Sequence, residues 1–244
     1  MQLLFEKLVG CGTVRFYRQL KSALLNEQSL FIVTANPETF KIGSQEKEFY
    51  QILKDPKTVL VPDGIGVVKA AKMLGYQVKE RIPGIDIAVQ LLEYAEELKK
   101  SVYLFGAKPQ VIEAMKRIMK EKYRHAKLAG ACDGYVKNKD KIFEHISQLQ
   151  PDIVLVALGI PAQEKLIYRH LDSFSKGILV GVGGSFDVMS GTKKRAPKFF
   201  IKLNLEWLYR ILKEPSRLKR FYQNNWGFML EVKNLKKRGF KFLG

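Results

Sequence analysis

Residues 151–170 read PDIVLVALGIPAQEKLIYRH, and residues 178–191 read ILVGVGGSFDVMSG. Each stretch runs from a continuous apolar segment through a glycine turn into a polar segment of the kind that opens a helix. Such units form the ligand-binding edge of α/β proteins, where loops follow the carboxyl ends of parallel strands. We therefore expect function near Gly159, Gln163, Gly183, Gly184 and Asp187.

The same alternation extends over most of the chain. Short, branched apolar runs typical of buried strands occupy 30–34, 58–62, 101–105, 152–158 and 178–182, with a weaker one at 126–130. Helical patterns lie between them at 65–74, 85–99, 109–123 and 139–149. This order predicts an α/β fold with a Rossmann-like, mainly parallel sheet and helices on both faces.

The pattern changes after Pro197. Two helices are expected, at 198–213 and 216–238, divided by Glu214 and Pro215. From Lys193 to the C-terminus, 15 Lys or Arg against 3 Glu supply +12 of the formal charge of +18. We expect a catalytic domain at 1–196 and a basic helical appendage at 197–244. Its cations and aromatics suit a membrane interface, although a basic stripe with aromatics also suits nucleic acid.

Composition excludes several classes of protein. A chain that is 46% hydrophobic can bury a full core, which excludes a disordered protein. No run of about 18 apolar residues and no signal-peptide layout occurs, so a cytoplasmic location is expected. Cys11 and Cys132 form no CxxC pair, the three histidines share no ligand spacing, and no Asp-x-Asp occurs. The GVGGSFD segment lacks the third glycine of a dinucleotide fingerprint. We expect neither a metal nor a cofactor.

Polar residues follow the expected strands. Asp63, in VPDGIGVV, is placed either to accept a proton from an attacking hydroxyl or to cap a helix, and the position alone favours neither. Thr34 and Asn36 offer a hydroxyl and an amide to a sugar or phosphate, but capping is the commoner role of such residues. Arg81 lies in a loop from which its guanidinium can clamp a phosphate. Gly106, in LFGAKPQ, opens a turn suited to an anion or ribose.

Arginines of the appendage form a second candidate group. Arg217 and Arg220 are three residues apart and share a helical face, while Arg210 comes from the preceding helix. If they converge, they can grip a pyrophosphate. The alternative is that the apolar residues of the appendage dock on the core while the cations face water.

Several motifs in unbroken order carry a family resemblance: TANPET, PDGIGVV, RIPGID, LFGAKP, ALGIPAQEK, GVGGSFDVMSG and RAPKFF...LEWLYRILKEPSR. Over about residues 30–220 the chain resembles the WecG/TagA/CpsF family of bacterial glycosyltransferases, glycosyltransferase family 26. The resemblance implies a metal-independent, inverting transfer of a sugar, often of the N-acetylmannosamine type, from its UDP donor to a polyprenyl-diphosphate-linked acceptor at the cytoplasmic face of the membrane.

The resemblance also implies residue roles. Asp63 matches the catalytic aspartate, and Thr34 and Asn36 match a Thr-x-Asn motif. Arg81 and Gln163 are expected to line the active site, and the three appendage arginines, Arg210, Arg217 and Arg220, to reach the lipid diphosphate. Nucleotide contacts are expected from Gly106, Tyr135, Gly159, Gly183, Gly184 and Asp187.

The expected reaction moves N-acetylmannosamine from UDP-N-acetylmannosamine to undecaprenyl-diphosphate-linked N-acetylglucosamine, for teichoic acid synthesis in the cell wall. Family members that use UDP-N-acetylmannosaminuronic acid or UDP-glucose in capsule or exopolysaccharide synthesis are the alternative. A nucleic-acid-binding protein is the rival from another class, but the tail charge alone supports it, so no nucleic acid partner is expected. A homo-oligomer that covers an apolar appendage is compatible with the sequence.

Overall fold

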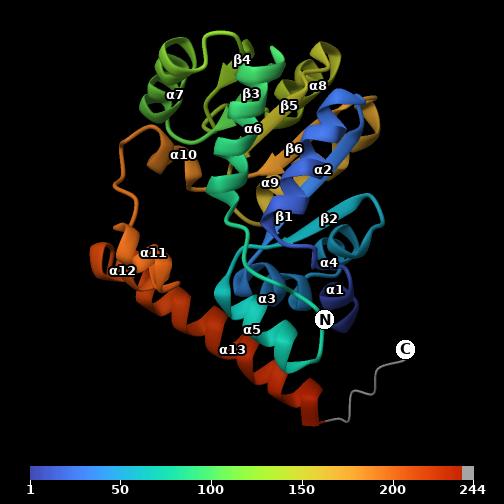
Figure 1. Ribbon diagram of the computed structural model, residues 1–244, viewed down its shortest axis with the longest axis vertical. Helices are drawn as coiled ribbons and strands as arrows, with labels where there is room; N and C mark the ends of the chain where they lie inside the picture. Colours follow the sequence, from blue (N-terminus) through green and yellow to red (C-terminus); the bar gives the residue numbers. More distant parts are fainter. Residues whose placement is uncertain (238–244) are drawn as a thin grey trace.

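Six parallel strands form one sheet in the order β2-β1-β6-β5-β3-β4 (Figure 1). The structure is a computed structural model that describes residues 1–237, except for the side chains of Arg217 and Arg220. Its strands are β1 (Ser29–Ala35), β2 (Thr58–Pro62), β3 (Ser101–Gly106), β4 (Lys127–Cys132), β5 (Ile153–Ala157) and β6 (Gly177–Gly181). The predicted α/β fold with a parallel sheet is confirmed.

Helices cover both faces of this sheet (Figure 1). One core cluster receives side chains from α2 (Thr13–Leu25), α6 (Gly84–Leu98), α7 (Pro109–Lys122) and α10 (Ser185–Met189). The other receives them from α1 (Gln2–Glu6), α3 (Pro37–Gln45), α4 (Lys47–Lys54), α5 (Ile65–Met73), α8 (Lys139–Leu149) and α9 (Ala162–His170), which a short 3-10 turn, η1 (Leu171–Ser173), follows.

The strands are continuously apolar because each is buried on both sides. In β1, Phe31 and Val33 enter one core cluster and Ile32 enters the other, as the alternation of a strand requires. All five residues of β5 are buried, and so are all five of β6. This two-sided burial made the strands recognisable in the sequence.

The C-terminal segment differs from its prediction. A single helix over 198–213 was expected, but α11 (Lys198–Lys202) and α12 (Glu206–Lys213) are separate helices. Asn204, between them, has a φ of 58°, a left-handed conformation that ends a helix and that asparagine tolerates better than most residues. A third helix, α13 (Arg217–Lys237), follows close to the expected 216–238.

Helix α13 attaches this segment to the rest of the molecule. It runs along α3 and α5 (Figure 1), and its Phe228 is fully buried. The Phe228 ring lies 5.4 Å from that of Phe40 and 6.2 Å from that of Phe5. Lys41 and Glu231 add an ion pair of 2.6 Å. Among residues 1–237, no helix combines the length and apolarity needed to cross a bilayer.

Candidate active site

Asp63 lies at the carboxyl end of β2, where the chain turns toward α5. Its amide donates to the carbonyl of Ala35 at 3.0 Å, and its carboxylate accepts a hydrogen bond of 3.2 Å from the amide of Gly84, the first residue of α6. The residue that caps α5 is Gly64, and it makes no side-chain capping bond. Asp63 therefore does not cap the helix that follows it, and its side chain faces the beginning of α6.

Two arginines and a second carboxylate surround Asp63. Arg81 comes from the loop before α6, and Arg210 comes from α12 in the C-terminal segment. Glu206, only 5% exposed, pairs with both: its Oε2 lies 3.3 Å from Nη2 of Arg81, and its Oε1 lies 2.8 Å from Nη2 of Arg210. The two sequence-predicted arginines are thus joined through a glutamate that the sequence interpretation did not include.

This environment sets the ionisation of both carboxyl groups. Burial raises the pKa of Asp63, and Glu206 raises it further, while Arg210, Arg81 and the Gly84 amide partly offset the rise. Burial also acts to raise the pKa of Glu206, but its two arginine partners outweigh that effect and leave the pKa below its usual value. Glu206 is therefore held more firmly in its ionised form than Asp63, and Asp63 is the better proton acceptor.

Thr34 lies near the end of β1 and Asn36 directly follows this strand, which pairs with the strand that precedes Asp63. The Thr34 hydroxyl donates to the carbonyl of Gly181 at 3.4 Å. The Asn36 side chain accepts from the Thr39 amide at 3.1 Å, and the Thr39 hydroxyl accepts from the Asn36 amide at 3.2 Å, which together form a capping box at the start of α3. The capping role weighed for Asn36 is the one that the structure shows.

Gln163 is buried and ties together two of the glycine loops. Its Oε1 accepts from the amides of Gly159 and Gly183, both at 3.1 Å, and its Nε2 donates to Glu164 at 2.7 Å. These bonds fix the loops after β5 and β6 against each other. Gln163 thus holds the two loops that form part of the predicted nucleotide edge.

The remaining loops continue along the same sheet edge. Gly106, the last residue of β3, has a φ of 115°, and a Cβ there would lie 2.4 Å from the Ala157 carbonyl oxygen, so only glycine fits. The Ala107 amide bonds to that carbonyl at 2.8 Å, and the Gly134 amide bonds to the Ala107 carbonyl at 2.9 Å. The loops after β5, β3 and β4 thus form one connected rim.

Tyr135 lies at the far end of this rim. It is exposed and follows β4, the edge strand opposite β2, and the adjoining Gly134 bonds to Ala107 in the turn after β3. Gly184 caps α10, and Asp187 lies in the first turn of that helix. The structure brings Asp63, Arg81 and Arg210 together and leaves Tyr135 remote. The side chains of Arg217 and Arg220 lie outside the described part of the chain.

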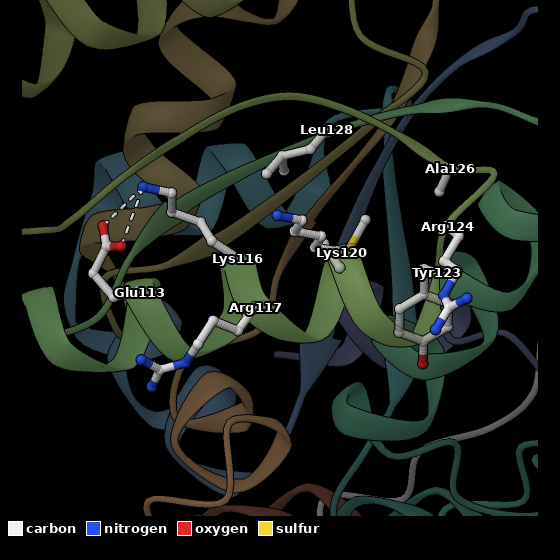
Figure 2. A pocket seen from close by; sticks show the side chains of 9 residues that line it. Glu113, Lys116, Arg117, Lys120, Tyr123, Arg124, Ala126 and Leu128 are labelled. Atoms are coloured by element: carbon white, nitrogen blue, oxygen red, sulfur yellow. Dashed lines mark hydrogen bonds and ion pairs between the residues drawn. The ribbon is translucent and has the colours of Figure 1, made fainter.

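Two hollows open on the surface. One, of about 450 Å³, adjoins Arg81 and lies between the catalytic domain and α11, lined by residues that include Tyr17, Ile65, Pro83 and Ile201. The other, of about 500 Å³, lies beside α7 and β4 (Figure 2), where Lys116, Lys120 and Leu128 line it, and it holds none of the predicted site residues. Among residues 1–237, no group of three or more His, Cys, Asp and Glu side chains gathers as metal ligands do.

Glu206 and Glu164 are the site residues that the sequence interpretation missed. Glu206 and Arg210 have the i, i+4 spacing of a helical ion pair, a signal that was present in the sequence. Glu164 is fully buried beside Gln163, and nothing in its sequence neighbourhood distinguishes it from an ordinary first-turn acid.

Comparison with known proteins identifies the family of the chain. The chain matches the family described as glycosyl transferase WecG/TagA/CpsF over residues 8–241. A protein of Bacillus spizizenii named N-acetylglucosaminyldiphosphoundecaprenol N-acetyl-beta-D-mannosaminyltransferase is 41% identical over 206 residues, which cover 84% of this chain and 80% of that protein.

Two further relatives carry the same name. The Bacillus subtilis protein is 41% identical over 78% of this chain and 73% of its own length. A Staphylococcus aureus protein is 35% identical over 85% of this chain and 82% of its own length. The family match and these three relatives each extend over most of the chain. The chain therefore belongs to the WecG/TagA/CpsF family of glycosyltransferases.

Proposed function

We propose that this glycosyltransferase moves N-acetylmannosamine from UDP-N-acetylmannosamine to undecaprenyl-diphosphate-linked N-acetylglucosamine, as the names of its relatives indicate for the sugar and the acceptor. The product belongs to the linkage chemistry of teichoic acids. The observation that carries the assignment of the active site is the placement of Asp63 beside Arg81 and Arg210, one arginine from each side of the junction between catalytic domain and appendage.

The proposed chemistry is a single displacement. The acceptor hydroxyl attacks the anomeric carbon from the face opposite UDP, the bond from that carbon to the UDP oxygen breaks, and Asp63 takes the hydroxyl proton. Burial favours this role, because a carboxylate with a raised pKa is a stronger base than an exposed aspartate. Arg81 and Arg210 supply positive charge for diphosphate oxygens.

The loops after β5, β6 and β3 are proposed to hold the nucleotide. Gly159, Gly183 and Gly184 lie in these loops and Gly106 ends β3, all at the carboxyl edge where parallel sheets bind ligands. Gln163 keeps two of these loops in register. Asp187 begins the helix after β6 and lies at the same edge. Tyr135 would reach this nucleotide from the end remote from Asp63.

The appendage is proposed to rest on the cytoplasmic face of the membrane, where the acceptor resides. Its helices expose a set of large apolar side chains: Phe199, Leu203, Trp207, Leu212, Leu218, Tyr222, Trp226 and Leu230. Exposed cations, including Lys198, Lys202 and Lys213, accompany them. Apolar side chains mixed with lysines are typical of helices that lie in a bilayer interface and meet anionic lipid.

The test is release of UDP by the purified chain, offered UDP-N-acetylmannosamine and the lipid-diphosphate N-acetylglucosamine acceptor. We expect acceptor-dependent release in the native protein and a fall of about 10²- to 10⁴-fold in Asp63→Asn, with donor binding retained. Asp172→Asn, on the exposed η1 turn, is the matched control and should keep full activity. Full activity in Asp63→Asn would exclude it as the base, and no release with any UDP-sugar would refute the proposed reaction.

A further inference from the structure

Glu206 is the buried acid that the proposed chemistry leaves unused. It begins α12, and an acidic residue in a first helical turn ordinarily stabilises the helix from a solvated position. Here the carboxylate is 5% exposed, and each of its two oxygens contacts a different arginine. A role in helix stability alone explains neither the burial nor the division of contacts.

The contacts cross the boundary between the appendage and the catalytic domain. Arg81 precedes α6, whereas Glu206 and Arg210 belong to α12, so the Arg81–Glu206 pair joins the C-terminal segment to the part of the chain that carries Asp63. The Arg81 side chain is largely enclosed, while Arg210 keeps about half of its surface free. Glu206 therefore fixes both guanidinium groups and leaves one of them accessible to a ligand.

Two acidic and three basic side chains make up this group. Asp63 and Glu206 face Arg81 and Arg210, and Arg195, from the segment before α11, adds its field at Glu206. Without a carboxylate between them, the largely enclosed Arg81 and the half-exposed Arg210 would repel each other, and Arg81 would carry a desolvation cost. Glu206 removes that repulsion and keeps the arginines close together before any diphosphate arrives.

We propose that Glu206 is a positioning residue that holds Arg81 and Arg210 together as one diphosphate clamp. This inference rests on the proposed function. It assigns to an acidic residue the task of pre-organising two cations for an anionic ligand, which lowers the cost of ordering them on binding.

Two variants separate geometry from charge. Glu206→Asp keeps the negative charge and the favourable first-turn acid, but its side chain is one methylene shorter and cannot reach both arginines from the same place. We expect the KM for the lipid-diphosphate acceptor to rise about tenfold, because one charge-assisted hydrogen bond is lost. The KM for the donor should stay unchanged. The acid limb of the pH–rate profile should stay near that of the native enzyme.

Glu206→Gln removes the charge and keeps the length. We expect the acceptor KM to rise and the acid limb of the pH–rate profile to move to lower pH, because a negative charge that raises the pKa of Asp63 is lost. Glu231→Gln is the matched control, since Glu231 also joins the appendage to the catalytic domain, through Lys41, away from the arginines. It should change neither the acceptor KM nor the pH profile.

A native acceptor KM in Glu206→Asp, or a Glu206→Gln variant that behaves like Glu231→Gln, would overturn the proposal and leave Glu206 as a helix-start residue. Thermal unfolding and donor binding verify that each variant is folded. If Glu206→Gln does not fold, the acceptor KM of Glu206→Asp alone tests whether Glu206 positions the arginines.

A second readout is independent of turnover. If the native enzyme transfers no sugar to any lipid-diphosphate acceptor, the proposed function fails, and amide hydrogen exchange in α12 still tests the contact with Arg81. Faster exchange in both Glu206 variants than in Glu231→Gln supports the contact. Equal exchange in all three refutes it.

Discussion

At the scale of single residues, Glu164 is a buried acid next to the carboxyl edge of the sheet. Its side chain is 0% exposed, and its Oε1 accepts from Gln163 while its Oε2 is buried with no partner in the described structure. Desolvation raises the pKa of Glu164 to about 7. Below that pH the protonated form holds Gln163 without placing a charge in the core, and Gln163 in turn holds the two loops of Gly159 and Gly183.

Stability should depend on this proton. The unfolded carboxyl group ionises near its ordinary pKa of 4.5, whereas the folded one retains its proton up to about 7, so the native protein loses stability as pH rises between those values. We expect Glu164→Gln to remove that loss, which amounts to at most about 3 kcal/mol. Urea unfolding at pH 5 and pH 8 should show that the free energy of unfolding of the glutamine variant, relative to that of the native protein, is higher at pH 8.

The control for that experiment is Glu121→Gln, at an exposed position on α7. Because this side chain is solvated in both states, its substitution should shift the free energy of unfolding equally at pH 5 and pH 8. An equal shift in Glu164→Gln would show that Glu164 is ionised in the folded protein.

Residues that follow strands were predictable in position but not in task. Asp63, Asn36 and Gly106 were located from the sequence because all parallel strands end at one edge. The sequence could not show that Asn36 bonds Thr39 within a capping box, because a cap and a ligand contact use the same side-chain atoms. Nor could it join Glu206 to Arg81, 125 positions away, since only the folded chain brings them together.

At the scale of elements, the strands were found more completely than the helices. Each of β1, β5 and β6 is buried on both sides and reads as a continuous apolar run. The helices α1, α3 and α4 are 5, 9 and 8 residues long and were not predicted, because so few turns give a weak periodic signal. The break between α11 and α12 was missed for a related reason: Asn204 alone marks it, without a glycine or proline.

The exposed faces of α12 and α13 carry the membrane prediction. Leu212 and Trp226 are exposed large apolar residues on these helices. We expect the double variant Leu212→Glu and Trp226→Glu to bind anionic phospholipid vesicles at least tenfold more weakly in a sedimentation assay, because each change removes buried apolar area and adds a repelled charge. UDP-sugar binding in the absence of lipid should persist, since neither side chain belongs to the sheet edge.

Leu149→Glu provides the comparison for that assay. Leu149 is also exposed, but it ends α8 in the catalytic domain. Its variant carries the same change and should bind vesicles as the native protein does. If Leu149→Glu weakens vesicle binding equally, the effect comes from overall charge and not from a specific face of the appendage. If the double variant binds vesicles as the native protein does, the appendage does not contact the membrane.

At the scale of the whole molecule, the proposed function depends on residues from both sides of Pro197. The catalytic domain brings Asp63 and Arg81, and the appendage brings Arg210 on α12. Helix α13 holds the appendage in place by lying along α3 and α5 (Figure 1). Most of its length is exposed, so few buried side chains, Phe228 and Val232 among them, secure the attachment.

Phe228 is the side chain that tests this arrangement. It packs against Phe40 and Phe5, and its truncation to alanine opens a cavity at the junction, with a cost of about 3–5 kcal/mol for a fully buried phenylalanine. Because that cost falls on the attachment of α13 and spares the sheet, Phe228→Ala should release the appendage while the catalytic domain stays folded. Limited proteolysis should then cut between α10 and α11 faster than in the native chain, and acceptor-dependent turnover should fall while donor binding remains.

Tyr222→Ala, on the same helix with an exposed ring, is the control and should be cut at the native rate. If Phe228→Ala unfolds the entire chain in one step, the appendage and the catalytic domain are a single cooperative unit, and Arg210 is never absent from the site.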